Sequence, residues 1–201
     1  MSAALTSQMN IEPITLKGRV VRLEPLGADH APALARVGLD PELWRWIPVP
    51  VSDAAQMQAY VQTALAEQAR GVSLPFALVL QGTGEVIGCT RYMNIERAHR
   101  RLEIGSTWLT RASQRSGANT EAKLLLLTHA FEVLLANRVE LKTDALNQTS
   151  RAAIARIGAT EEGIFRKHIV CASGRIRDTA WFSIIAAEWP AVKARLAALL
   201  R

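Results

Sequence analysis

The sequence predicts an α+β, or mixed α/β, fold: one mostly antiparallel twisted sheet of about seven strands with helices on both faces. Consecutive strand patterns joined by tight turns such as residues 81–84 indicate antiparallel hairpins. Helical patterns separate the other strands, but without the regular βαβ alternation of a dinucleotide-binding fold. The length of 201 residues, with 49% hydrophobic and 21% charged residues, fits a single soluble domain.

The first half of the chain is predicted to contain a strand and two helices. Residues 1–13 are expected to form a flexible tail, and residues 14–201 the domain. Alternating apolar residues favour a strand at 16–26, and apolar residues at helical spacing favour a helix at 29–39. The aromatic segment 42–50 is predicted to be a loop. Ser52 or Asp53 is suited to cap a helix that runs to about Arg70 and stops at Gly71.

The second half is predicted to supply most of the sheet. Strands are expected at residues 75–80, 85–95 and 100–109, followed by a glycine-containing turn and a helix at 117–135. A strand at 138–143, a helix at 147–157, strands at 163–171 and 178–185, and a short helix from Trp189 complete the order.

Composition limits the function classes. The net charge of +6 suits an anionic partner, but the cations are scattered and mostly arginine, so nucleic-acid binding is not favoured. Cys89 and Cys171 lie far apart without metal-type spacing, which indicates a reducing compartment and predicts no metal. Apolar runs stay below the roughly 18 residues that span a bilayer, and residues 1–13 lack a secretory pattern. A cytoplasmic location without membrane attachment is therefore expected.

The most informative segment is the strand, turn and helix start at residues 103–120. A turn containing Gly117 leads directly into a leucine-rich helix, so free backbone N–H groups and the positive end of the helix dipole converge there. Such a place holds a phosphate or pyrophosphate, although an ordinary loop-to-helix turn would have the same pattern. No Gly-Lys-Ser/Thr follows the turn, so it is not a Walker loop.

Over residues 16–190 the chain resembles the GCN5-related N-acetyltransferase (GNAT) family, within it the RimJ/RimL-like branch of ribosomal-protein N-terminal acetyltransferases. The family's phosphate motif stands here as Gln114-Arg115-Ser116-Gly117-Ala118-Asn119. Asn119 departs at the last position, and Arg115 replaces a glycine that many members have. Segments 103–105, 119–123, 147–153 and 177–179 also match, in the family's order.

The resemblance implies acetyl-CoA as the cosubstrate, no metal, and direct attack by an amine of a peptide or protein N-terminus or of a small molecule. It also makes a homodimer plausible. The pantetheine arm would lie between the 100–109 and 138–143 strands, and a main-chain N–H near Leu109 would polarise the thioester carbonyl. The residues expected to bind the cofactor are Leu109, Gln114, Arg115, Ser116, Gly117, Ala118, Asn119, Thr120, Asn147 and Ser150.

Glu103 is the preferred general base. Strict strand alternation places Glu103, Gly105, Thr107 and Leu109 on one face, where small neighbours leave room for substrate or water. In the histone-acetyltransferase branch the catalytic glutamate has the same offset from the phosphate motif. An exposed or salt-bridged strand glutamate is the alternative interpretation.

Ser150 and His168 are the other candidate catalytic residues. In the resembling branch a serine placed like Ser150 lies near the thioester and can act as an acid, although Asn147 and Ser150 would also suit helix capping. The tyrosine that many members use is replaced by Ile154, and the branch's strand glutamate is missing. His168 is a titratable substitute for that glutamate, or a structural histidine.

Trp44, Trp46 and Thr107 are the predicted acceptor-binding residues. The two tryptophans stand where the family's acceptor-side loop lies, but they could equally plug the core. Two other function classes stay open: a CoA-binding regulatory or interaction module that has lost catalysis, and a basic nucleic-acid binder whose affinity would fall steeply with salt.

Overall fold

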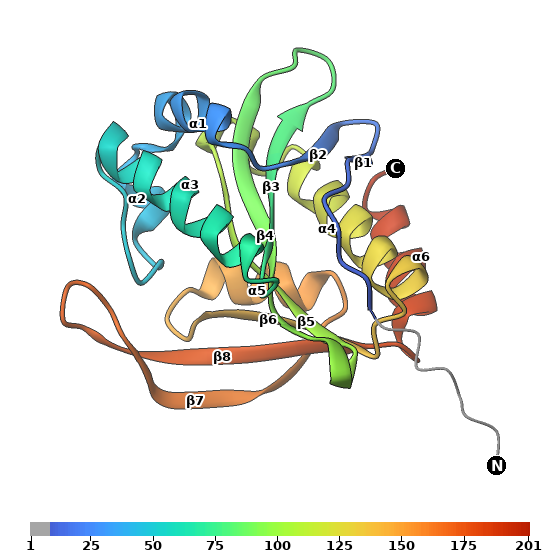
Figure 1. Ribbon diagram of the computed structural model, residues 1–201. Coiled ribbons are helices and arrows are strands. Elements are labelled where there is room, and N and C mark those ends of the chain that lie inside the picture. The colour runs from blue at the N-terminus through green and yellow to red at the C-terminus, as the bar shows by residue number, and fades with distance from the viewer. Residues whose placement is uncertain (1–8) are drawn as a thin grey trace.

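The computed structural model describes residues 9–201, which form one sheet packed between two layers of helices (Figure 1). Within the described residues the sheet has eight strands in the order β1-β2-β3-β4-β5-β6-β8-β7. Their bounds are β1 Leu16–Lys17, β2 Val21–Pro25, β3 Leu74–Leu80, β4 Val86–Glu96, β5 Arg101–Leu109, β6 Arg138–Asp144, β7 Thr160–Val170 and β8 Ile176–Ile185.

The predicted α+β class and the mostly antiparallel sheet are confirmed. Neighbouring strands pair antiparallel except β5 and β6, which run parallel. The strand expected at residues 16–26 is a hairpin of β1 and β2, because the chain reverses at Gly18 and pairs Leu16 with Leu23. This division accounts for an eighth strand.

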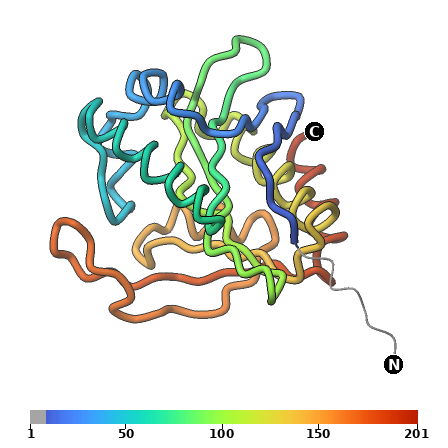
Figure 2. Tube along the Cα trace, viewed as in Figure 1, coloured from blue at the N-terminus to red at the C-terminus, as the bar shows by residue number. Residues whose placement is uncertain are grey.

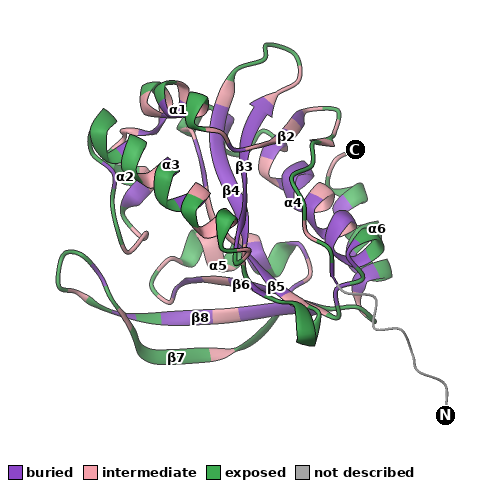
Figure 3. Ribbon diagram, viewed as in Figure 1, coloured by how far each residue is buried: buried purple, intermediate pink, exposed green. Residues whose placement is uncertain are grey.

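Helices cover both faces of the sheet, as predicted. The helices are α1 Ala31–Gly38, α2 Pro41–Trp44, α3 Ala54–Ala69, α4 Ala118–Thr128, α5 Gln148–Arg156 and α6 Trp189–Ala198. One core cluster includes Leu34, Met57 and Val61, beneath α1 and α3, and the other includes Leu126 and Leu196, beneath α4 and α6. The ribbon of these helices carries both buried and exposed residues along its length in Figure 3, as expected of helices with one face on the sheet.

Three expected boundaries differ. The loop predicted at 42–50 overlaps the short helix α2, which begins just before it. This helix forms because the Asp40 carboxylate accepts a hydrogen bond from the Glu42 N–H and Pro41 occupies the first turn. The helix expected at 117–135 consists of α4, which ends at Thr128, and a π-helix at His129–Val133 that continues it. Of the predicted tail, residues 1–8 lie outside the described residues, whereas Met9 is buried in the core, so packing begins before residue 14.

A β-bulge in β5 changes which side chains share a face. Arg91 pairs with Gly105 and Cys89 with Trp108, so β5 carries one extra residue, and Ser106 has a φ of 47°. The expected common face of Glu103, Thr107 and Leu109 is therefore wrong beyond the bulge. Leu109 packs into the core beneath α4 together with Leu102 and Ile104, while Trp108 packs beneath α1 and α3.

The sheet opens between β5 and β6. These strands pair only from Arg101 with Arg138 to Glu103 with Glu140. Beyond that point β5 continues to pair with β4 as far as Leu109, and β6 with β8 as far as Asp144. The two parallel strands thus diverge (Figures 1 and 2). The narrow end of the gap between them lies at Glu103, the last residue of β5 that pairs with β6.

Candidate active site

The turn before α4 presents its backbone to the wide end of this gap. Arg115 and Gly117 both have left-handed backbones, with φ values of 61° and 85°. Gly117 is the N-cap of α4 and has no side chain with which to cap it; the Ala118 N–H donates to Ser116 Oγ at 3.4 Å, and the next N–H groups of the first turn remain available to an anion. Asn119 lies inside the helix with ordinary backbone angles, which removes the need for glycine at the motif's last position.

The main chain of Leu109 faces the gap. The Thr110 N–H donates to Ile87 O on β4, at 2.8 Å. Successive residues of a strand turn their N–H groups to opposite edges, so the Leu109 N–H points away from β4 and toward β6. The side chain of Gln114 donates to Leu109 O at 3.2 Å, which ties the turn to the end of β5.

Two further features near the helix start are available to a ligand: a cation and an unpaired acceptor oxygen. Arg156 on α5 donates through Nη2 to Thr120 Oγ1 at 3.0 Å, so a cation lies beside the first turn of α4. The Asn119 Oδ1 is buried without a hydrogen-bond partner among the described residues. Uncapped amides and a cation suit a phosphate, whereas the Asn119 oxygen only accepts hydrogen bonds and would need an N–H group of the ligand or a water molecule.

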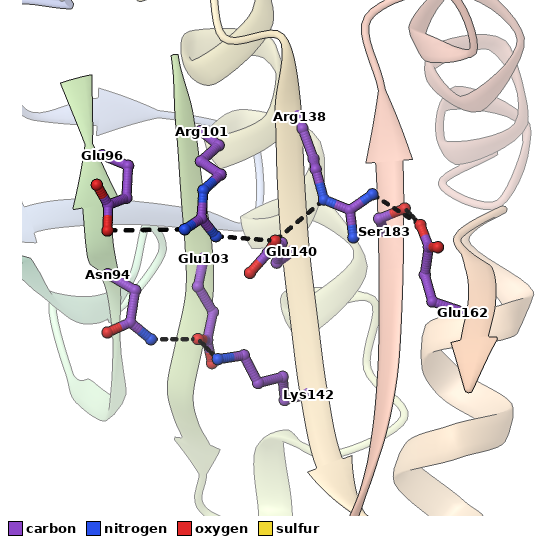
Figure 4. Close-up of polar contacts among 9 residues, drawn as sticks. All are labelled: Asn94, Glu96, Arg101, Glu103, Arg138, Glu140, Lys142, Glu162 and Ser183. Carbon is purple, nitrogen blue, oxygen red and sulfur yellow. Dashed lines mark hydrogen bonds and ion pairs between the residues drawn. The ribbon is translucent and has the colours of Figure 1, made fainter. Parts of the chain in front are cut away.

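Glu103 lies at the narrow end of the gap in a buried ion pair (Figure 4). Only 5% of Glu103 is exposed, and its Oε2 is 2.6 Å from Lys142 Nζ on β6 and accepts from Asn94 Nδ2 at 2.7 Å. A Cβ added at Gly105 would lie 2.6 Å from Met93 Sδ and 2.9 Å from Glu103 Oε1, so a side chain at this position would displace the Met93 or Glu103 side chain. The salt-bridged state that sequence left as an alternative is the one observed.

A second row of charges crosses the same strands one step away from Glu103 (Figure 4). Arg101 contacts Glu96 and Glu140, and Arg138 contacts Glu140 and Glu162. Glu162 also accepts a hydrogen bond from Ser183 on β8. The row links the parallel part of β5 and β6 to both neighbouring strands, so it anchors the point from which the gap opens.

Ser150 and Asn147 lie at the start of α5. Asn147 Oδ1 accepts from the Ser150 N–H at 3.0 Å, so the Asn147 side chain caps the helix. Ser150 is half-buried, and the hydrogen bonds of the described residues include none from its Oγ. Ile154, at the position where many relatives carry tyrosine, is buried in the core.

His168 lies on exposed β7 and is not in direct contact with Glu103. Its Nδ1 is 3.1 Å from Thr179 Oγ1, and its ring meets Trp181 edge-on at 5.7 Å between centroids. Lys142 Nζ sits 3.7 Å from the centre of the Trp181 ring. Trp181 and Lys142 therefore stand between His168 and Glu103.

The predicted acceptor residues have different surroundings. Trp44 is 2% exposed, donates through Nε1 to Gly38 O at 2.7 Å, and packs edge-on against Tyr60. Trp46 is half-buried, with the guanidinium of Arg175 5.9 Å from its ring centre. Thr107 is directed toward α4, because the bulge has turned it off the Glu103 face.

A pocket of about 240 Å³ lies between the segment around α2 and the turn joining β7 to β8. It is bounded by apolar side chains and by two arginines; its walls include Trp44, Arg45, Ile47, Val51, Cys171 and Arg175. Arg175 forms an ion pair with the buried Asp144 at the end of β6. The pocket thus borders the wide end of the gap from the side opposite α4.

Lys123, which its sequence pattern did not mark as a candidate site residue, lies near the gap. Lys123 is on α4, is only 7% exposed, and donates from Nζ to Thr107 Oγ1 at 3.0 Å. Burial lowers its pKa to about 7, against a smaller opposing effect of the Glu103 charge. The signal available in the sequence was a lone lysine in an otherwise apolar, buried run from Ala122 to Leu127.

A mixed sheet that splays beside an uncapped helix start is the architecture of CoA-dependent N-acetyltransferases. The comparisons with known proteins agree with it. A family model described as "Acetyltransferase (GNAT) domain" matches residues 21–160. The chain belongs to this GNAT family and is an N-acetyltransferase by class.

Individual relatives support the RimJ/RimL-like branch. A Bacillus subtilis protein named as a ribosomal N-acetyltransferase, YdaF, is 34% identical over 110 residues, which cover 55% of this chain and 59% of that protein. The chain thus matches less than two thirds of that relative's length. A structure from T. thermophilus, provisionally named an acetyltransferase, is 40% identical with a TM-score of 0.86, covering 96% of this chain and all of that one.

A structure that contains a coenzyme is also similar. Mycobacterium smegmatis RimJ in complex with CoA-disulfide is 28% identical with a TM-score of 0.81, over 93% of this chain and 95% of that one. Within residues 9–201, no helix has the length and apolar character needed to cross a bilayer.

Proposed function

We propose that the protein transfers the acetyl group of acetyl-CoA directly to a primary amine, either the N-terminus of a peptide or protein or a small amine. The observation that carries this proposal is the uncapped start of α4 beside the gap between β5 and β6. The name of YdaF, a ribosomal N-acetyltransferase, supports testing an amine of a protein or peptide first.

The first turn of α4 would hold the pyrophosphate. Its backbone N–H groups, from Arg115 to Asn119, supply the donors, and the helix dipole adds a favourable field. Arg156 would add a cation at the same place. The pantetheine arm would occupy the gap, with the Leu109 N–H polarising the thioester carbonyl.

Glu103 would assist loss of the proton from the attacking amine. Its Oε2 is engaged by Lys142 and Asn94, so the free Oε1 beside Gly105 is the oxygen that could act, through a water molecule. An α-amino group has a pKa of about 7.7–8.0, against about 10.4 for lysine, and so needs less help from such a base. Ser150 and His168 stay as secondary catalytic hypotheses, and Trp44, Trp46 and Thr107 as acceptor-side hypotheses.

The proposal is tested by calorimetry with coenzyme A and by thiol release from acetyl-CoA with N-terminal peptides and small amines. Arg156→Ala should weaken coenzyme A binding several-fold, because it removes a cation beside the phosphates. Arg36→Ala makes the same charge change at an exposed position of α1 and should leave coenzyme A binding unchanged. No measurable heat with coenzyme A for the native protein would refute the proposal.

A catalytically weak CoA-binding module is the second candidate. Two observations favour it: Glu103 is held by Lys142, and the tyrosine position is filled by buried Ile154. Glu103→Gln separates the candidates. If the native protein acetylates an amine and Glu103→Gln is impaired while both bind coenzyme A alike, the module interpretation fails. The cytoplasmic location and the homodimer stay predictions.

A further inference from the structure

The side chain of Lys123 is an ammonium group enclosed by the fold without a counter-charge at contact distance. It is 7% exposed, and among the described residues it forms no ion pair. Its one hydrogen bond goes to Thr107 Oγ1 at 3.0 Å, and that hydroxyl also contacts Thr90 Oγ1 at 2.7 Å. An ammonium has three N–H donors, so two of those of Lys123 have no acceptor among the described residues. Burying a charged group with unpaired donors costs free energy.

Lys123 lies beneath the gap, near its narrow end. Thr107 is on β5 beyond the last residue that pairs with β6, Glu103. The bulge at Ser106 turns Thr107 toward the α4 side of the sheet, where Lys123 meets it. Lys123 is also close enough to Glu103, on the opposite face of β5, for the two charges to interact.

Lys123 lies along the path proposed for the cofactor. The phosphates would bind at the first turn of α4, and the pantetheine arm would run along the gap toward Glu103. Lys123 is on the next turn of the same helix, on its sheet-facing side. Its Nζ reaches Thr107, which lies on β5 between Glu103 and Leu109, so the sulfur end of an arm that follows the gap would come to lie near it.

We propose that Lys123 donates a proton to the sulfur of coenzyme A as the acetyl–sulfur bond breaks; this inference rests on the proposed function. The amine nitrogen forms a bond to the carbonyl carbon, and the carbon–sulfur bond breaks with its electron pair going to sulfur. The Lys123 ammonium transfers one proton to that sulfur. The nitrogen of the new amide releases its surplus proton to solvent, and solvent returns one proton to Lys123.

The acidity of Lys123 suits this step. Burial lowers its pKa to about 7, below the value of about 8.5 for an ordinary thiol, so transfer to a thiolate is downhill. Glu103 is the charged group that acts on it from the packed strands. Of the titratable neighbours in the α4 layer, burial raises the pKa of Tyr92 and lowers that of His129, which moves both away from neutrality.

The decisive variants are Lys123→Met and Lys123→Arg. Methionine fills the same space without a proton, and arginine keeps the charge but does not release its proton at ordinary pH. Both should bind coenzyme A about as tightly as the native protein, by calorimetry, and show a kcat lower by about 100-fold or more. Lys193→Met removes a half-exposed lysine on α6 and should have native kinetics.

The pH profile separates proton donation from a structural role. With saturating substrates, the native kcat should fall above pH 7 as Lys123 loses its proton, and this limb should be absent from the residual activity of Lys123→Met. A Lys123→Met kcat within twofold of native would overturn the inference. So would weakened coenzyme A binding in both variants with an unchanged profile, since Lys123 would then only hold the cofactor.

Two remaining outcomes are distinguishable. If Lys123→Met does not fold, Lys123→Arg and the native pH profile decide, and a native kcat that keeps rising through pH 8.5 would refute proton donation. If the native protein itself binds no coenzyme A or transfers no acetyl group, the proposed function fails first, and this inference with it.

Discussion

Glu103 and Lys123 lie near the gap on opposite faces of β5, and their charged groups have different hydrogen-bond partners. Glu103 has a lysine and an amide at hydrogen-bond distance, whereas Lys123 has only a hydroxyl. Burial without a counter-charge at contact distance disfavours the charged form of Lys123 and lowers its pKa. The site therefore combines a fixed carboxylate with an amine that can exchange its proton near neutral pH.

Lys123 should make the stability of the protein depend on pH. Its folded-state pKa of about 7 is below the value of about 10.4 in an unfolded chain, so between these values the unfolded state binds more protons. The loss of folding stability that comes from burying the Lys123 ammonium has its full size below pH 7, and it decreases as the pH rises toward 10.4. Lys123→Met should therefore gain more stability over native at pH 7 than at pH 9, by about 2 kcal/mol.

Urea denaturation of both proteins at the two pH values measures this difference. Lys193→Met, whose lysine is half-exposed, provides the control and should show no such dependence. Equal gains for Lys123→Met at pH 7 and pH 9 would contradict the low folded-state pKa.

At the scale of elements, the turn before α4 and the bulge in β5 place the site. Gly117 takes its left-handed backbone without strain, but Arg115 takes a similar one at a cost. Local sequence predicts the glycine turn because glycine marks it. The bulge at Ser106 has no such mark, so the face of Thr107 could be known only from the pairing of β5 with β4.

Arg115→Gly should stabilise the fold by about 1 kcal/mol, because glycine adopts a φ of 61° without steric penalty. Arg115→Ala removes the same charge and should bring no such gain. Chemical denaturation compares the two variants directly. Equal stabilities would show that the turn is not strained at this residue.

Asn147 tests whether capping and cofactor contact are separate roles. Asn147→Ala should lose about 1 kcal/mol of stability, because the Ser150 N–H loses its acceptor. Asn147→Ser keeps a capping oxygen but lacks the amide, so it should keep its stability and bind coenzyme A more weakly if the amide contacts pantetheine. Denaturation and calorimetry on both variants distinguish the roles; native binding by Asn147→Ser would leave Asn147 as a cap only.

At the scale of the whole molecule, the proposed cofactor site joins parts of the chain that meet only after folding. Three parts of the chain meet at the gap: β5, the turn before α4, and α5. Together they span more than fifty residues of sequence. A ligand there bridges both sides of the splay. Its binding therefore adds to the stability of the entire domain rather than to one element.

Coenzyme A at 100 times its dissociation constant should raise the free energy of unfolding by about 2.7 kcal/mol. Thermal or chemical unfolding with and without the ligand measures the shift. Arg156→Ala should show a smaller shift at the same ligand concentration, and Arg36→Ala the native shift. A native protein whose unfolding does not respond to coenzyme A would contradict a site shared by these elements.

The sequence by itself determined the succession of strands and helices and the glycine turn before α4. Both depend on local patterns: apolar periodicity, and a glycine followed at once by a helical run. Tertiary structure alone decided that Glu103 pairs with Lys142, that Trp44 is buried against Tyr60, and that Lys123 is enclosed beneath the gap. These contacts depend on strand register and on a bulge, which are fixed by hydrogen bonds between distant segments rather than by neighbouring residues.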